Sequence, residues 1–420
     1  MYLFIRAFLV GITCFFFSFK THAYYPATLW SSDRISETLV GVRVGPVLKD
    51  EKPALVTLSP HHLVIYEKNE EKISKLIEYN NLPDNEWIKL GLYDFEGDGV
   101  EEILIAGFRK GRPLSVVLQV ENKQIIQKAE APFFVNVIEW EGKKQAVGQN
   151  SLGLDDFTGP VFKLELKGKA LQKGEIFFLP GGLSGKAIPL FSLQGFFSKE
   201  ISSDGFLYLN DLGNLVHFGK KVDTSQKTKW KTKWTSSPSY GGAVYFLKRV
   251  VANPFGQVEN QRFYVPVSFE SNSSFWSLKS PVDSQGLENA LCPEPVSPEP
   301  VLVYGVCVSP KKLPRKNLNE PVKGDPWKLY LIKNEGYLKN VIGAVPSVKN
   351  SQMVRVLWTG YGFQEEWNSP RLDGAISDFT LVDWDGDGRE EILAAFLLRD
   401  KGYTDTLKKQ DSLLLVIQPK

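Results

Sequence analysis

A nine-residue acidic pattern occurs twice and constrains the fold more than any other feature of the chain. Residues 94–102 have the sequence DFEGDGVEE, and residues 383–391 have the sequence DWDGDGREE. Each copy has acidic side chains at positions 1, 3, 5 and 9, with a glycine at position 6 that permits a tight turn. Carboxylates this close repel one another, and calcium relieves the repulsion because it takes about six to eight oxygen ligands. The pattern predicts two calcium loops; the alternative is two acidic surface hairpins without metal.

The segments around the loops decide which type of calcium loop this is. An EF-hand needs a helix on each side and a glutamate at position 12, where this chain has Ile105 and Ala394. The EF-hand is therefore excluded. Short apolar or alternating runs, which are typical of strands, flank both loops, at 88–93, 103–106, 377–382 and 392–395.

Strand-flanked loops of the form D-x-D/E-G-D-G-x-x-E resemble the FG-GAP or VCBS-type repeat of integrin α chains and many secreted bacterial proteins. The resemblance covers residues 87–108 and 376–398. It implies an all-β fold, a seven-bladed β-propeller with four-stranded antiparallel blades. It also implies two structural calcium sites. Their ligands would be Asp94, Glu96, Asp98, the Val100 carbonyl and Glu102, and Asp383, Asp385, Asp387, the Arg389 carbonyl and Glu391.

Weaker copies of the same unit support a repeat fold. Residues 40–56 align with 88–104 at an offset of 48 residues and keep only Asp50 of the loop acids. Residues 134–147 are similar to a third copy, with a shortened loop and lysines in place of acids. A period of about 45–50 residues is typical of propellers. Both copies are predicted to be structural turns without calcium.

A propeller must also close its ring, because an open ring leaves exposed strand edges. The C-terminal strand is predicted at residues 411–417. We expect either residues 27–30 or residues 38–44 to pair with it.

The N-terminus has the features of a cleavable secretory signal. Arg6 precedes an apolar run over 7–19, and small residues precede a cleavage site after Ala23. The alternative of a lipoprotein modified at Cys14 fits the preceding residues poorly. Residues 1–23 are thus predicted to be a signal peptide, and residues 24–420 a single β-propeller domain. The mature protein is expected to be secreted or periplasmic, without a membrane span.

The net charge of the mature chain argues against nucleic acid as the partner. Removal of residues 1–23 takes away Arg6 and Lys20 and no acid, which leaves 48 basic and 48 acidic residues. A neutral chain argues against a dedicated nucleic-acid-binding protein.

A proline-rich segment at 279–327 differs from the rest of the chain and contains Cys292 and Cys307. Dense proline is incompatible with central strands, so we interpret the segment as an insertion from the propeller rim. In an oxidising compartment the two cysteines are expected to form a disulfide; the alternative is two free thiols. A long loop closed in this way is our first prediction for a partner-binding surface, against a purely structural blade connection.

A second candidate surface lies at residues 227–234, where lysine alternates with other residues. In a strand, one face would carry Lys227, Lys229, Lys231 and Lys233, and the other Trp230 and Trp234. These four lysines form a positively charged stripe, which suits an anionic glycan, a lipid headgroup or an acidic partner. The alternative is tryptophans packed between blades with the lysines in water.

No catalytic motif is present. His61, His62 and His217 lack zinc-ligand spacing, and there is no G-x-S-x-G nucleophile elbow. The sequence therefore predicts a non-catalytic binding, adhesion or scaffold protein for a protein or glycan ligand. The alternative is an enzyme with its site in the central channel, acting on glycans or as a quinoprotein-like oxidoreductase.

Overall fold

The structure is a computed structural model of the 420-residue chain. It describes residues 28–49, 52–69, 72–82, 84–140, 143–152, 157–178, 190–196, 205–209, 215–222, 228–235, 301–303, 306–308, 328–337, 347–358, 363–398 and 411–419. The predicted signal peptide lies outside these residues.

The described residues form strands and one short 3-10 turn, Leu190–Ser192. The N-terminal sheet contains β2 (Gly41–Gly45), β3 (Ala54–Leu58), β4 (His62–Asn69) and β5 (Lys72–Asn80). Then come β6 (Asn85–Tyr93), β7 (Glu102–Arg109), β8 (Arg112–Glu121), β9 (Gln124–Ala131), β10 (Phe134–Trp140), β11 (Lys143–Ser151), β12 (Phe157–Lys167) and β13 (Ala170–Phe178). A further sheet contains β14 (Gln194–Phe196), β15 (Gly205–Leu209), β16 (Leu215–Val222) and β17 (Thr228–Thr235), and a two-stranded pair contains β18 (Val301–Val303) and β19 (Val306–Val308). Next are β20 (Lys328–Tyr337), β21 (Ser347–Trp358) and β22 (Phe363–Asn368), and the C-terminal sheet contains β23 (Gly374–Val382), β24 (Glu391–Leu398), β25 (Ser412–Ile417) and β1 (Thr28–Ser31).

This architecture confirms the all-β prediction, but the sheets are not a set of seven four-stranded blades. Strands β6 to β13 form one eight-stranded sheet, because Ala170 of β13 pairs in parallel with Glu130 of β9. That pair joins two antiparallel meanders, β6–β9 and β10–β13, at their last strands. In the described part of the chain, β20–β22 form a sheet of three strands.

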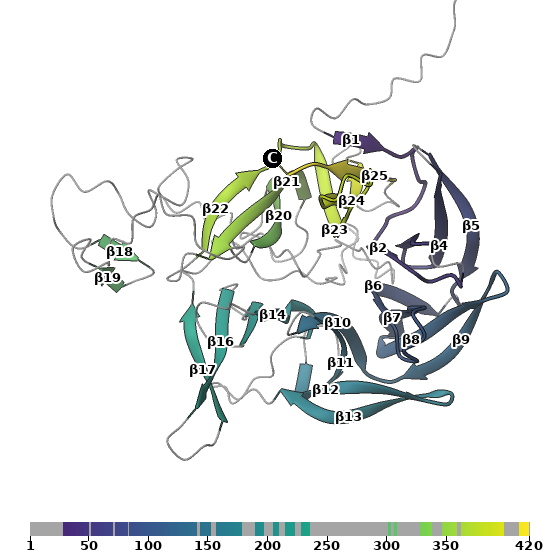
Figure 1. Ribbon diagram of the computed structural model, residues 1–420, viewed down its shortest axis with the longest axis horizontal. Coiled ribbons are helices and arrows are strands. Elements are labelled where there is room, and N and C mark those ends of the chain that lie inside the picture. The colour runs from purple at the N-terminus through teal and green to yellow at the C-terminus, as the bar shows by residue number, and fades with distance from the viewer. Residues whose placement is uncertain are drawn as a thin grey trace, which may run out of the picture.

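The sheets follow one another in chain order around the middle of the view in Figure 1. The first strands of neighbouring meanders contact each other in the order β23, β2, β6, β10 and β14. The N-terminal and C-terminal sheets are therefore neighbours, although they lie at opposite ends of the chain.

Burial on both faces explains the unbroken apolar run in β7. Ile103 and Ile105 lie in a core cluster shared with the N-terminal sheet, whereas Leu104 and Ala106 lie in a cluster shared with β10–β13. Strand β24 repeats this arrangement with alternate residues facing the β20–β22 sheet and the N-terminal sheet. Alternating side chains point to opposite faces of a strand, so the sheets that contain β7 and β24 each contribute to two cores.

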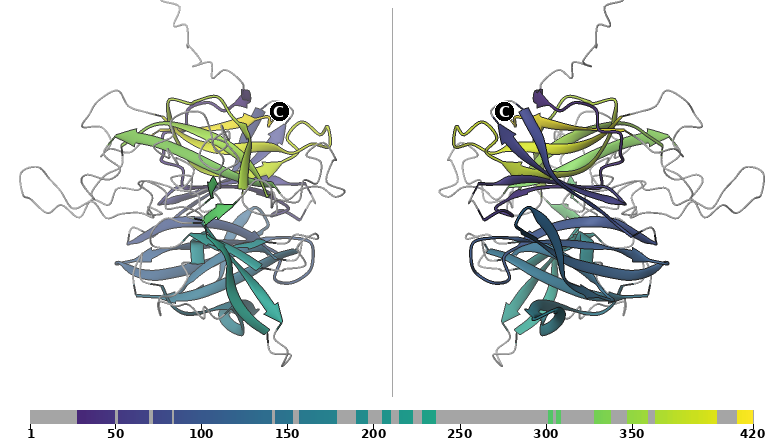
Figure 2. Two further views of the ribbon diagram at one scale, coloured as in Figure 1. Left: turned by 90° about the vertical axis from the view of Figure 1, so that its left-hand side faces the viewer. Right: turned by 90° about the vertical axis from the view of Figure 1, so that its right-hand side faces the viewer.

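The two ends of the described chain pair as predicted. Strand β1 is antiparallel to β25, with Thr28 opposite Ile417 and Ser31 opposite Leu415, which confirms the first of the two expected segments. The second, at 38–44, includes β2, which pairs with β3 instead. Both side views in Figure 2 place the purple β1 beside the yellow C-terminal strand.

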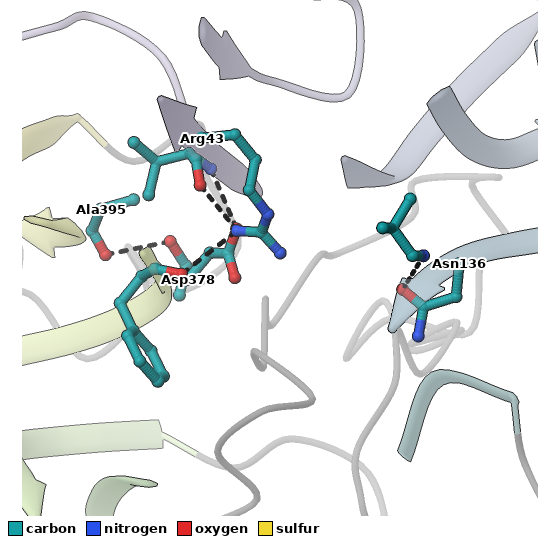
Figure 3. Close-up of polar contacts among 8 residues, drawn as sticks. Arg43, Asn136, Asp378 and Ala395 are labelled. Atoms are coloured by element: carbon teal, nitrogen blue, oxygen red, sulfur yellow. Dashed lines mark hydrogen bonds and ion pairs between the residues drawn. The ribbon is translucent and has the colours of Figure 1, made fainter. Parts of the chain in front are cut away.

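A buried ion pair joins the N-terminal and C-terminal sheets (Figure 3). Arg43 Nη1 lies 2.6 Å from Asp378 Oδ2, and the same oxygen accepts a hydrogen bond from the Val42 amide at 2.9 Å. The Arg43 guanidinium also donates to the carbonyl oxygens of Val42 and Phe379. The carboxylate of β23 therefore contacts both the backbone and a side chain of β2.

Glycine allows the first strands of neighbouring meanders to approach closely. A Cβ atom at Gly91 of β6 would lie 2.8 Å from Val137 Cγ2 of β10, closer than real Cβ contacts. We predict that Gly91→Ala lowers the free energy of unfolding by about 1–3 kcal/mol through overpacking, as measured by urea denaturation. Val137→Ala in the same chain should recover part of this loss.

Gly174→Ala serves as the control for this substitution. Gly174 lies on β13, where the three atoms nearest to an added Cβ all belong to the exposed side chain of Glu165. That side chain can move, so little change is expected. An equal loss for both variants would show that strand propensity, not the β6–β10 contact, causes the effect.

Candidate metal centre

The second acidic loop, residues 383–391, connects β23 to β24 and turns on two glycines. Gly386 and Gly388 have backbone φ angles of 82° and 84°, values that residues other than glycine rarely adopt. Asp383 accepts hydrogen bonds from both amides, through Oδ1 from Gly386 at 2.8 Å and through Oδ2 from Gly388 at 3.0 Å. Asp385 and Asp387 each accept from the amide two residues later. The backbone thus orients these three carboxylates.

Three carboxylates of this loop converge. Of the described residues, Asp383, Asp385 and Glu391 are the group of acidic, histidine or cysteine side chains that brings at least three ligand atoms within 4.8 Å of one another. Both aspartates are exposed, whereas Glu391 is fully buried. The group therefore has one face toward water and one toward the protein.

Glu391, the buried member of this group, carries an oxygen without a hydrogen-bond partner. Its Oε2 accepts a hydrogen bond from the Trp384 amide at 2.8 Å, but its buried Oε1 has no hydrogen-bond partner. Burial raises the pKa of Glu391, and the charges of Asp385, Asp387 and Asp383 raise it further, against the opposing effect of the Trp384 amide. A buried acceptor without a donor is costly, and a cation would satisfy it. The donor set consists of carboxylates, which suits a hard cation.

The first acidic loop, residues 94–102, connects β6 to β7 and turns on two glycines in the same way, since Gly97 and Gly99 also have positive φ angles. Asp94 accepts hydrogen bonds from Gly97 and Gly99, and Asp98 accepts from the Val100 amide. The buried Glu102 accepts from the Phe95 amide at 2.9 Å, as Glu391 does from Trp384. The predicted strand, loop and strand unit is confirmed in both copies.

The two loops differ in the partners of their acids. Glu96 Oε1 lies 3.7 Å from Lys128 Nζ of β9, so this longer side chain turns toward a lysine. Glu102 Oε1 accepts a hydrogen bond from Gln119 Nε2 of β8 at 3.4 Å. Burial raises the pKa of Glu102, and the charges of Glu96 and Asp94 act in the same direction. The first loop does not bring three ligand oxygens within 4.8 Å, the spacing found in the second.

The carbonyl ligands remain predictions. Val100 and Arg389 occupy the expected loop position, and their amides donate to Asp98 and Asp387. A role for their carbonyl oxygens follows from the resemblance alone.

Position 2 of each loop is an anchoring position that the acidic pattern alone does not reveal. Trp384 is 7% exposed and packs against Trp30 of β1, with ring centroids 4.8 Å apart. Phe95 packs against Tyr93 at 4.8 Å, beside the core shared with β10–β13. An aromatic residue at the same position of both copies was the available signal. Each loop is thus anchored in the core between two neighbouring sheets.

The other candidate residues lie largely outside the described part of the chain. Cys292 and Lys227 fall outside it, as does most of the 279–327 segment, in which β18 and β19 pair. The backbone of Cys307 pairs with Leu302 in that hairpin. Lys229, Lys231 and Lys233 lie on β17, which is confirmed as a strand and pairs with β16.

Comparison with known proteins adds no relative, since no protein-family model matches the chain and no curated protein matches it significantly. Within the described residues, no helix has the length and apolar character needed to cross a membrane.

Proposed function

We propose that this protein is an exported, calcium-binding β-propeller of the FG-GAP type that binds a partner and does not catalyse a reaction. The observation that carries the proposal is the convergence of Asp383, Asp385 and Glu391, with the buried Oε1 of Glu391 left without a donor. The same backbone turn in the first acidic loop supports a repeated unit. The seven-bladed ring is supported by meanders that contact each other in chain order and by the pairing of β1 with β25.

Calcium fits the second loop better than the first. Three carboxylates would supply part of its oxygen shell, and the exposed side of the loop leaves room for water and a backbone carbonyl. Its positive charge would neutralise acids that repel one another, the buried Glu391 among them. We place a second, weaker calcium ion at Asp94, Glu96, Asp98 and Glu102, where it must compete with Lys128 and Gln119.

The partner side of the proposal rests on the sequence. A protein or glycan ligand in the envelope or outside the cell would bind the rim insertion at 279–327 or the lysine stripe. Three of the four lysines of the stripe, Lys229, Lys231 and Lys233, lie on β17. The bound calcium would hold the β6–β7 and β23–β24 hairpins in place.

Terbium luminescence tests the metal centre directly. Tb³⁺ binds calcium sites and is sensitised by a nearby tryptophan, and Trp384 lies within the second loop. We expect saturable emission on excitation of tryptophan, displaced by excess calcium and lost in Trp384→Phe. Asp385→Asn should weaken Tb³⁺ affinity by at least about tenfold, which corresponds to roughly 1.4 kcal/mol of lost binding.

Glu96→Gln is the matched control, because it removes the acid at the same position of the first loop. It should leave the Trp384-sensitised signal unchanged. Emission that calcium cannot displace, or equal emission from wild type and Asp385→Asn, would rule out this site.

A further inference from the structure

The second acidic loop lies where the two ends of the described chain meet. Its residue Trp384 belongs to a core cluster built from both the N-terminal sheet and the C-terminal sheet. Lys68 of β4 places its ammonium group 4.9 Å from the centre of the Trp384 ring and donates a hydrogen bond to the Trp384 carbonyl oxygen. Together with the Trp30 contact, this puts Trp384 between β1 and β4.

The N-terminal segment is held on the C-terminal sheet by strand pairing, by hydrogen bonds and by the ion pair of Arg34 with Asp411. The amides of Ser32 and Ile35 donate to the carbonyl oxygens of Leu414 and Ser412, both at 2.9 Å. The Ser412 hydroxyl accepts from the Leu39 amide and donates to the Glu37 carbonyl oxygen. β1 has only four residues, with β25 as its neighbour in the sheet. Its docking therefore depends on the surface that β25 and Trp384 present.

Glu391 connects this surface to the candidate metal centre. One oxygen of its carboxylate accepts from the Trp384 amide, and a carboxylate oxygen of Glu391 lies within 4.8 Å of ligand oxygens of Asp383 and Asp385. The same buried side chain therefore positions both the cation ligands and the backbone of Trp384. A change in the charge balance of the loop would act on Trp384 directly.

Each acidic loop has a lysine partner from a neighbouring meander, at a different loop position. Glu101 Oε1 lies 2.5 Å from Lys144 Nζ of β11, and the Glu101 amide donates to the Pro46 carbonyl oxygen at 2.8 Å. The corresponding residue of the second loop, Glu390, is exposed. The first loop is therefore held at Glu101 by Lys144, and the second at Trp384 by Lys68. The exposed Asp383 and Asp385 leave the second loop open to a cation.

We infer that cation occupancy of the 383–391 loop controls the docking of the N-terminal strand, so that the metal acts as a clasp for ring closure. The inference rests on the proposed metal site. With the cation bound, Glu391 holds the loop in the form that presents Trp384 to Trp30 and Lys68. Without it, repulsion among the carboxylates loosens the loop and the contacts that hold β1.

Amide hydrogen exchange on the full chain tests the clasp, with calcium or with a chelator, alongside calorimetric measurement of calcium binding. We expect the Ser32 and Ile35 amides to exchange on the order of tenfold faster without calcium. Amides in β7 and β8, distant from the closure, should change little. Calcium binding with unchanged exchange at Ser32 and Ile35, or a uniform change over all strands, would overturn the clasp and leave the metal site intact. Absence of calcium binding would overturn the proposed metal site itself.

Two variants separate the clasp from the site. Trp384→Leu keeps the backbone amide that binds Glu391, so it should still bind calcium, but calcium should no longer slow exchange at Ser32 and Ile35. Phe95→Leu, at the same position of the first loop, should preserve that response. Lys68→Met is a milder variant, outside the loop, and should raise exchange at these amides in the presence of calcium. Normal protection in both Trp384→Leu and Lys68→Met would refute the inference.

Discussion

Asp378→Ala is expected to lower the free energy of unfolding by about 3–5 kcal/mol, the range for removing one partner of a buried ion pair. The side chain of Asp378 is 1% exposed and that of Arg43 is 15% exposed, so solvent screens the pair weakly. Removal of the carboxylate would take an ionic partner from Arg43 and an acceptor from the Val42 amide. Because the pair joins β2 to β23, the loss should fall on the closure of the sheets.

Urea denaturation of three variants, each compared with the wild type, checks this prediction. Asp378→Asn keeps an acceptor for the Val42 amide and should lose less stability than Asp378→Ala. Glu130→Ala removes an acid from the exposed Arg109–Glu130 pair, where a loss of about 0.2–1 kcal/mol is typical. The prediction is wrong if Asp378→Ala is no more destabilising than Glu130→Ala.

Calcium is expected to stabilise the folded protein by about 4 kcal/mol when its free concentration is on the order of 1,000 times its dissociation constant. Binding to the folded state alone accounts for the gain, since the unfolded chain does not bring Asp383, Asp385 and Glu391 together. Chelation should remove the whole increment. The measurement is the free energy of unfolding with calcium and with chelator.

Asp383→Asn should abolish most of the calcium increment, because it removes one charge from the acidic group while keeping an oxygen for the Gly386 amide. Glu390→Gln is the matched control. It removes an equal charge from the same loop, but Glu390 is exposed and outside the group. It should retain the increment. A calcium response in Asp383→Asn as large as in wild type would exclude the assignment of this residue as a ligand.

Much of the local structure could be predicted from the sequence. The strand segments around both acidic loops correspond to β6, β7, β23 and β24, and the strand at 411–417 corresponds to β25. These predictions succeeded because apolar alternation and loop glycines act over neighbouring residues. The Asx-turns, in which Asp98, Asp385 and Asp387 accept the amide two residues later, are equally local.

The candidate site was predicted less completely. The two loops have nearly the same sequence, yet only the second gathers three ligand oxygens among the described residues. Glu96 lies near Lys128 and Glu102 near Gln119, and both partners come from other strands. The longer side chain at position 3 was the one difference visible in the sequence. Its effect depends on which groups lie within its reach.

The sequence by itself determined the β class and the two acidic loops, and it narrowed the strand that closes on the C-terminus to two segments, of which the structure selects β1. The tertiary structure alone decided which carboxylates converge, how the strands divide into sheets, and that Trp384 lies between Trp30 and Lys68. Arg43 and Asp378, 335 positions apart, show the physical reason. Burial and ionic contacts depend on distance in space, and residues this far apart come together only when the sheets pack.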